Sequence, residues 1–232
     1  FEQKQLKHAL DFATSNRLEL DILLQHYTYD SLKLEAAKFL IRNMPHCYSY
    51  QQGGEMDSVK RVRTYYSPFG QIDQTYARRW GHYTYRNLLK IYDAHIITAE
   101  YLIDNIDRAF DNWQKRPWNR SLSFEDFCEY LLPYRIGDEP LEEWRELYEK
   151  KYGYLLDSIY KGGDVVEAAN LVSRHLQEPV FIYCEDFELP HIGPRYLFSH
   201  RYGSCVDAAD IVTYAFRAVG IPCMEDTDAR GG

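Results

Sequence analysis

The chain has 232 residues, a formal charge of −8, and 45% hydrophobic against 27% charged residues. This balance is ordinary for a globular protein and excludes a wholly disordered chain. An acidic chain without a basic stripe is poorly suited to bind nucleic acid, and no apolar run approaches the roughly 18 residues of a membrane span. We therefore expect no nucleic-acid partner and no membrane-spanning segment.

Hydrophobic periodicity predicts helices over most of the chain. In residues 31–44 the apolar side chains fall on one face, and Asp30 or Ser31 can cap the start. Similar stripes predict further helices over residues 98–114, 124–132, 140–160, 164–177 and 205–219. Strand patterns are confined to residues 180–184 and 221–223, and residues 46–54 are typical of a loop. The sequence therefore predicts a mainly α fold with at most a small sheet near its C-terminal end.

The segment RYGSCVDAADIVTYAFRAVGIPC, residues 201–223, holds the most informative pattern in the sequence. Apolar residues follow Cys205 at helical spacing, at positions 208, 211, 212, 215, 216 and 219, and Gly220 stands where helices commonly end. This spacing predicts that Cys205 lies at the N-terminus of a helix, on its buried face.

A helix N-terminus carries partial positive charge and free N–H groups, which favour a thiolate and can hold an oxyanion. Gly203 lets the backbone approach a substrate closely, and with Ser204 it would form the oxyanion side of the site. Asp207 and Asp210 oppose this role, because their charges would repel a thiolate. Cys205 is therefore either a nucleophile or a small hydrophobic residue packed at a helix start, and both interpretations stay open.

Other reactive patterns are weaker. The cysteines, at positions 47, 128, 184, 205 and 223, are odd in number and form no CxxC pair, so they do not indicate a disulfide framework. Cys128 lies among the aromatic residues of its own helix and is expected to be structural. Cys184, His191, His200 and Cys205 follow one another at intervals of 7, 9 and 5 residues, which matches no zinc-binding spacing. Motifs for nucleotide binding and serine hydrolysis are absent, so we expect no metal and no cofactor.

The pattern G-x-C, opening a helix that ends in R-A-x-G-I-P, resembles the nucleophile helix of the transglutaminase-like superfamily. The upstream segments DSLKLEAAKFLIRNMP, YLIDNIDRAFDNW and SFEDFCEYLLPYRIGDEPLEEWR resemble one branch of it, the transglutaminase-domain proteins of Bacteroides-type gut bacteria. The resemblance implies a helical N-terminal region over residues 1–177 and the start of a transglutaminase-like domain over residues 178–232. It also implies a periplasmic or outer-surface location of the lipoprotein type.

In that superfamily an α+β papain-like core carries a cysteine nucleophile on a helix, and a histidine and an aspartate on strands that follow it. Cys205 matches the nucleophile. After Ile221 and Pro222 this chain holds only CMEDTDARGG, so the resemblance implies a papain-like core that is only partly present, without that histidine and aspartate. The alternative is that His191 or His200 serves from upstream, which would break the order of the family.

Two functions follow from this resemblance. In the first, the protein is a cysteine enzyme that acts on the peptide or amide bonds of a protein or peptide, by hydrolysis rather than cross-linking, and residues 1–232 alone are inactive. In the second, it is a non-catalytic module that retains the transglutaminase-like fold. Its 21 tyrosines would then hold a glycan or a protein at the cell surface.

Overall fold

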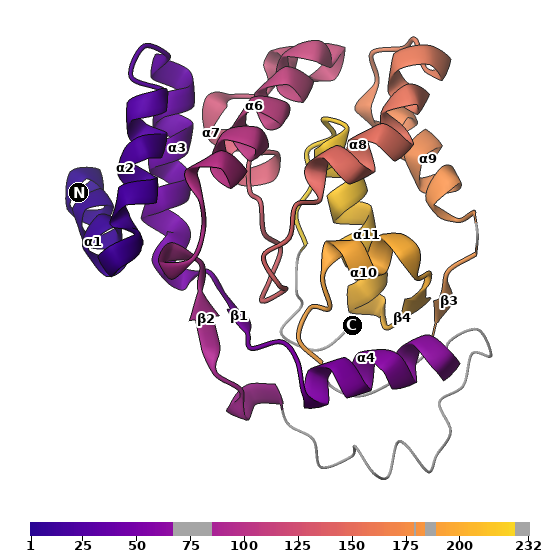
Figure 1. The fold of residues 1–232 in the computed structure, drawn as a ribbon. Helices are drawn as coiled ribbons and strands as arrows, with labels where there is room; N and C mark the ends of the chain where they lie inside the picture. The colour runs from indigo at the N-terminus through magenta and orange to yellow at the C-terminus, as the bar shows by residue number, and fades with distance from the viewer. Residues whose placement is uncertain (67–84, 179, 184–188, 226–232) are drawn as a thin grey trace.

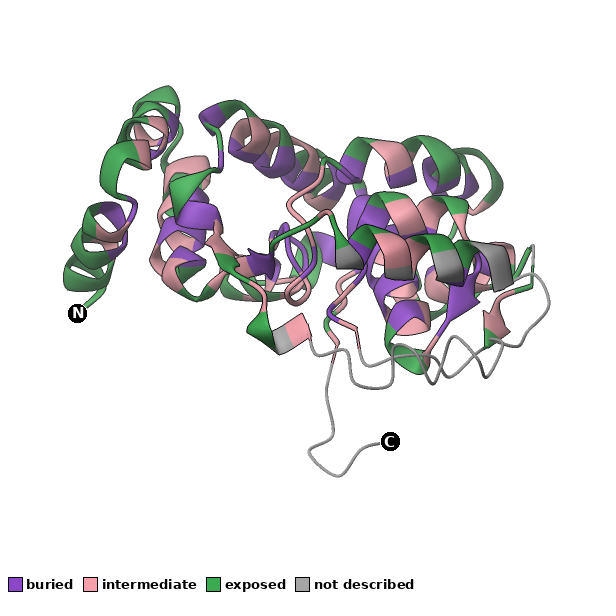
Figure 2. Ribbon diagram, turned by 60° about the horizontal axis from the view of Figure 1, so that its bottom comes forward, coloured by how far each residue is buried: buried purple, intermediate pink, exposed green. Residues whose placement is uncertain are grey.

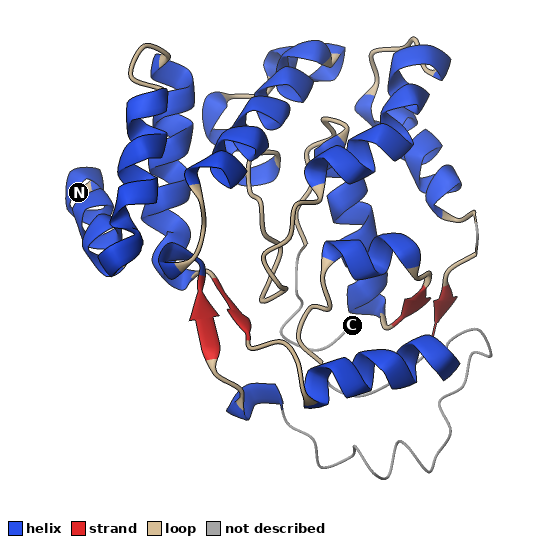
Figure 3. Cartoon of the chain, in the orientation of Figure 1, coloured by secondary structure: helices blue, strands red, loops and turns tan. Residues whose placement is uncertain are grey.

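The computed structural model describes residues 1–66, 85–178, 180–183 and 189–225. Within these residues the chain is mostly helical with short strands, as the sequence predicts (Figure 3). The C-terminal residue of the predicted strand 180–184, Cys184, lies outside the described residues. None of the described helices is both long enough and apolar enough to span a membrane.

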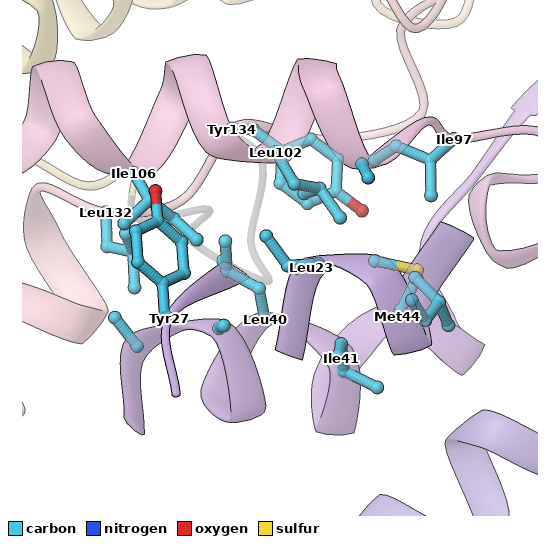
Figure 4. Close-up of a cluster of buried hydrophobic side chains, with 14 of the residues drawn as sticks. Leu23, Tyr27, Leu40, Ile41, Met44, Ile97, Leu102, Ile106, Leu132 and Tyr134 are labelled. Atoms are coloured by element: carbon cyan, nitrogen blue, oxygen red, sulfur yellow. The ribbon is translucent and has the colours of Figure 1, made fainter. Parts of the chain in front are cut away.

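The N-terminal part is a layer of helices that share one hydrophobic cluster, which extends from Ala9 to Tyr134. Side chains from α2 and α3 face side chains of α6 and of the segment after α7 in this cluster (Figure 4). Asp30 caps α3 by accepting the Lys33 N–H at 3.1 Å, as the sequence predicts. The helices are α1 (Glu2–Phe12), α2 (Arg17–His26), α3 (Ser31–Asn43), α6 (Ala99–Lys115) and α7 (Phe124–Tyr130).

The C-terminal part packs around α11 and has a second hydrophobic cluster, from Trp144 to Ile221. The expected domain boundary at residue 177 lies in the sequence between α9 and α11, whose apolar residues pack together in this cluster. Buried and exposed residues alternate around the helices of both parts, as amphipathic helices require (Figure 2). The helices are α8 (Arg145–Tyr154) with a π turn (Leu155–Ile159), α9 (Val165–Leu176), α10 (Pro194–Ser199) and α11 (Cys205–Ala218).

Helix α4 (Glu55–Tyr66) belongs to the N-terminal half of the sequence but runs beneath α10 and α11 (Figure 1). The Thr64 hydroxyl lies 2.9 Å from the Tyr196 hydroxyl of α10. Two small sheets flank this helix: β1 (Tyr48–Tyr50) pairs antiparallel with β2 (Lys90–Tyr92), and β3 (Ile182–Tyr183) pairs parallel with β4 (Tyr202–Gly203). The described 3₁₀ turns are Thr14–Asn16, Met44–His46, Tyr85–Asn87, Asp93–His95 and Pro117–Ser121.

The structure corrects three sequence predictions. Residues 46–54 contain β1 and are not simply a loop. Residues 221–223 are not a strand, because the Cys223 N–H donates to the Tyr130 carbonyl at 3.1 Å and so follows the end of α7. The helix expected over 140–160 begins only at Arg145. The segment before it is irregular, and the Trp144 indole ties it to the segment after α7 by donating to the Tyr134 carbonyl at 2.8 Å.

The C-terminal end of α11 is bound by side chains from outside the helix. A helix leaves its last four carbonyls without partners, and buried carbonyls need donors. Here the donors come from the segment after α6 and from the start of α8, so they lock α11 against the N-terminal part. They are Arg145 to Arg217 O at 3.0 Å, Arg116 to Val219 O at 2.8 Å, and Trp118 and Asn119 to Gly220 O at 2.9 Å each.

We predict that Gly220→Ala destabilises the protein by about 2–4 kcal/mol in urea unfolding. Gly220 has a φ of +83°, and a Cβ there would lie 2.8 Å from the Asn112 carbonyl oxygen. The matched control is Gly163→Ala, where a Cβ would meet nothing within 4 Å, and we expect a change within about 0.5 kcal/mol. Equal stability of the two variants would show that the hydrogen-bonded end of α11 tolerates a side chain at residue 220.

Candidate functional site

Cys205 is the first residue of α11, and its side chain is exposed. The prediction that it lies on the buried face is wrong, because that face runs instead through Asp207, Ile211, Tyr214 and Ala218, which succeed one another at intervals of three or four residues. For the same reason Cys205 is not a hydrophobic residue packed at the helix start. Among the described residues, none forms a hydrogen bond with its thiol.

Ser204 and Asp207 fix the N-terminus of α11 as a capping box. The backbone N–H and the hydroxyl of Ser204 both donate to Asp207 Oδ2, at 2.8 and 2.9 Å. This arrangement satisfies the N–H groups of Ser204 and Asp207 and leaves the neighbouring thiol outside the network.

Asp207 is also the partner of a buried arginine from α4. Arg63 Nη2 lies 2.5 Å from Asp207 Oδ2, and Nη1 lies 3.3 Å from Oδ1. Both side chains are almost completely buried, at 1% and 7% exposed. Gly203 makes room for this pair: its φ is +150°, and a Cβ at this position would overlap the Arg63 guanidinium and the Asp207 carboxylate. Gly203 and Ser204 therefore have structural partners, while their expected role at an oxyanion site stays a prediction.

Asp210 pairs with His191 one turn further along α11. The two carboxylate oxygens lie 3.0 and 2.9 Å from His191 Nδ1, and Asp210 is fully buried. Burial opposes protonation of His191, but the hydrogen bond and charge of Asp210 outweigh it and raise the histidine pKa to about 9. Burial raises the pKa of Asp210 to about 7 against the effect of His191, and the nearby charges of Glu139 and Glu225 raise it further. The pair therefore holds a proton at neutral pH.

The acids expected to repel a thiolate are thus both compensated. Arg63 neutralises Asp207, and the protonated His191 neutralises Asp210. Sequence reasoning missed both partners, because they lie 144 and 19 residues away in the chain. The available signal was the pair of acids on the inner face of α11, since buried carboxylates require partners.

The second histidine considered from the sequence, His200, is engaged elsewhere. Its Nδ1 lies 2.9 Å from the Tyr196 carbonyl oxygen, and its ring stacks on that of Tyr196 with centroids 4.2 Å apart. Within the described part of the chain, neither His191 nor His200 forms a hydrogen bond with the Cys205 thiol. The structure therefore pairs His191 with a carboxylate but joins neither histidine to the cysteine.

A cavity of about 670 Å³ lies between the two parts of the molecule. Its wall is formed by α3, the start of β1, the segment after α7 and the N-terminal end of α11. Tyr48, Tyr134, Arg135 and His191 line it, together with Val206, which follows Cys205 in the chain. Its lining combines aromatic rings with charged groups, which is the usual composition of a ligand pocket.

The other described cysteines differ from Cys205 in environment. Cys128 is 3% exposed, and burial raises its pKa to about 12. It packs in the N-terminal cluster, as expected for a structural residue. Burial likewise raises the pKa of Cys47 to about 11. These thiols are mostly protonated at neutral pH and are poor nucleophiles.

Comparisons with protein-family models, curated proteins and solved structures found no match to this chain.

We predict that Arg63→Met destabilises the protein by about 3–5 kcal/mol, because it leaves the buried Asp207 carboxylate without its counter-charge. Chemical denaturation monitored by circular dichroism measures the change. Arg61→Met on the same helix is the control: Arg61 is exposed and bonds only to Ser58 among the described residues, so we expect a change within about 0.5 kcal/mol. Similar losses from both substitutions would mean that the Arg63–Asp207 pair does not hold α4 to α11.

Proposed function

We propose that this chain is part of a transglutaminase-like cysteine enzyme that acts on peptide or side-chain amide bonds, with Cys205 as nucleophile. The Cys205 sulfur would attack the amide carbonyl carbon, the amine would leave, and water would hydrolyse the resulting thioester. Free N–H groups of the first turn of α11 would stabilise the oxyanion. The general base would be the histidine that the family places on a strand after the nucleophile helix.

One observation carries the proposal. In the run Gly203, Ser204, Cys205 and Asp207, the glycine, serine and aspartate each have a structural partner, whereas the cysteine has none among the described residues. An exposed thiol on a helix that is fixed at both ends is an arrangement suited to attack on an external substrate. The compensated charges of Asp207 and Asp210 remove the objection that they would repel a thiolate.

The 670 Å³ cavity favours a second candidate, a non-catalytic binding module. Tyr48, which is partly exposed, can stack against a sugar ring or an aromatic side chain, and His191 adds a polar group. Cys205 is not part of the wall of this cavity. A binding module would therefore use the cavity without needing the thiol.

We predict that among the described cysteines iodoacetamide labels Cys205 first and Cys128 last in the folded protein, because of these four only Cys205 combines exposure with a position at a helix N-terminus. Timed alkylation followed by peptide mass mapping measures the order. The Cys205→Ser variant should lose the fast phase and keep the slow ones. If Cys128 reacts before Cys205, the enzyme proposal loses its residue-level support.

The decisive experiment compares two proteins: residues 1–232, and a longer product of the same reading frame that includes the family's histidine and aspartate strands. We predict amide hydrolysis by the longer protein and none by residues 1–232, because general-base catalysis contributes about 10²–10⁴-fold. Release of ammonia or amine from glutamine-containing peptides measures it, with Cys205→Ala as the control. Turnover by residues 1–232 that needs Cys205 would assign the base to an upstream histidine. Inactivity of both proteins would favour the binding module.

A further inference from the structure

A cluster of three potential metal ligands includes a buried residue of α11, the helix on which Cys205 is exposed. His191, Asp210 and Glu225 each offer one donor atom, and these atoms all lie within 4.8 Å of one another. The residues come from the segment before α10, from α11 and from the segment that follows α11. Intervals of 19 and 15 residues match no short metal-binding motif, so spacing along the sequence could not reveal the cluster.

The distances in the cluster suit one ion. His191 Nδ1 lies 2.9 and 3.0 Å from the Asp210 oxygens, and two ligands that bind an ion at right angles, each about 2.1 Å away, lie about 3 Å apart. Ligands on opposite sides of such an ion are about 4.2 Å apart. Donor atoms that all lie within 4.8 Å of one another are therefore close to the spacing that one shared ion requires.

Two buried polar groups at the cluster lack partners. Glu225 Oε2 is buried and forms no hydrogen bond with a described residue. The Tyr214 hydroxyl, on a fully buried side chain one turn after Asp210 on α11, likewise has no described partner. Buried polar groups without partners are rare in folded proteins and often mark an unfilled site.

The neighbouring charges leave an excess of carboxylates. Glu139 is satisfied by the N–H groups of Ile136 and Gly137, at 2.7 Å each, so it is not a free ligand. Arg217 is the nearby cation on α11, but it donates to the carbonyls of Cys223 and Arg135, both at 3.0 Å, and not to a carboxylate. Among the described residues His191 is the cation in direct contact with Asp210, and a donor atom of Glu225 lies within 4.8 Å of both.

We propose that His191, Asp210 and Glu225 bind a single divalent transition cation at the edge of the 670 Å³ cavity. One imidazole and two carboxylates form a ligand set that suits Zn²⁺ and Mn²⁺. The ion would take the place of the proton between His191 and Asp210 and would engage the unpartnered Glu225 oxygen. It would tie the segment after α11 to the segment before α10. This site stands independently of any reaction at Cys205.

Titration of the metal-free protein with Mn²⁺, followed by electron paramagnetic resonance of the free ion, tests the proposal. Mn²⁺ is chosen because thiols are poor ligands for it, so the free cysteines do not interfere. We expect saturation at one ion per chain and a rise in the thermal unfolding midpoint as Mn²⁺ is added. The Glu225→Gln variant should bind at least about 10-fold more weakly and lose the thermal shift.

Glu129→Gln is the matched control, because Glu129 is a carboxylate on the wall of the same cavity but outside the cluster, and it should bind Mn²⁺ as the parent does. Glu225 is partly exposed and lies beyond the last helix, so its substitution tests the ligand without disturbing the core. Absence of saturable Mn²⁺ binding, or equal binding by Glu225→Gln, would overturn the proposal. Zn²⁺ binding that persists in Glu225→Gln but disappears in Cys205→Ser would place the ion on the thiol and would also overturn it.

Discussion

The position of α11 depends on hydrogen bonds at both of its ends. At the N-terminus the Asp207 carboxylate joins Ser204 to Arg63 of α4, and at the C-terminus side chains from α8 and the segment after α6 bind the last carbonyls. Helix α8, which supplies Arg145, contributes residues to the C-terminal hydrophobic cluster, and α6, which precedes Arg116, contributes residues to the N-terminal one. Because buried polar groups are stable only when paired, rotation of α11 would break several of these bonds at once. The helix is therefore held in one orientation, with Cys205 facing out and Asp210 facing in.

Periodicity predicted the helices well because each one buries a single apolar face. The predicted bounds of α3, α6 and α9 agree with the structure to within one residue at each end. The start of α8 was placed too early, since Pro140 and the acids after it resemble a first helical turn, whereas the Trp144 indole ties that irregular segment to the Tyr134 carbonyl. Strands β1 and β2 have three residues each, which is too short for an alternating pattern to stand out.

The candidate site was only half visible in the sequence. Cys205 and its helix could be located because a glycine, a serine and an apolar stripe surround them. The orientation of the helix could not, since it depends on charged residues that are buried in pairs. Ile211, Ala215 and Val219 of the predicted apolar stripe are buried, but Asp207, Asp210 and Arg217 are buried as well, so α11 is enclosed on more than one side. The paired charges therefore add buried positions that hydrophobic periodicity alone could not reveal.

The Arg63–Asp207 pair also sets the order in which the molecule can assemble during synthesis. The two residues are 144 positions apart, so Arg63 leaves the ribosome long before its partner exists. The N-terminal cluster, which ends at Tyr134, can collapse during that interval, whereas α4 has no buried carboxylate to receive its guanidinium. The junction between α4 and the N-terminus of α11 can therefore close only after residue 207 has been synthesised. Cys205 takes its fixed position at the surface of the folded protein at this late step.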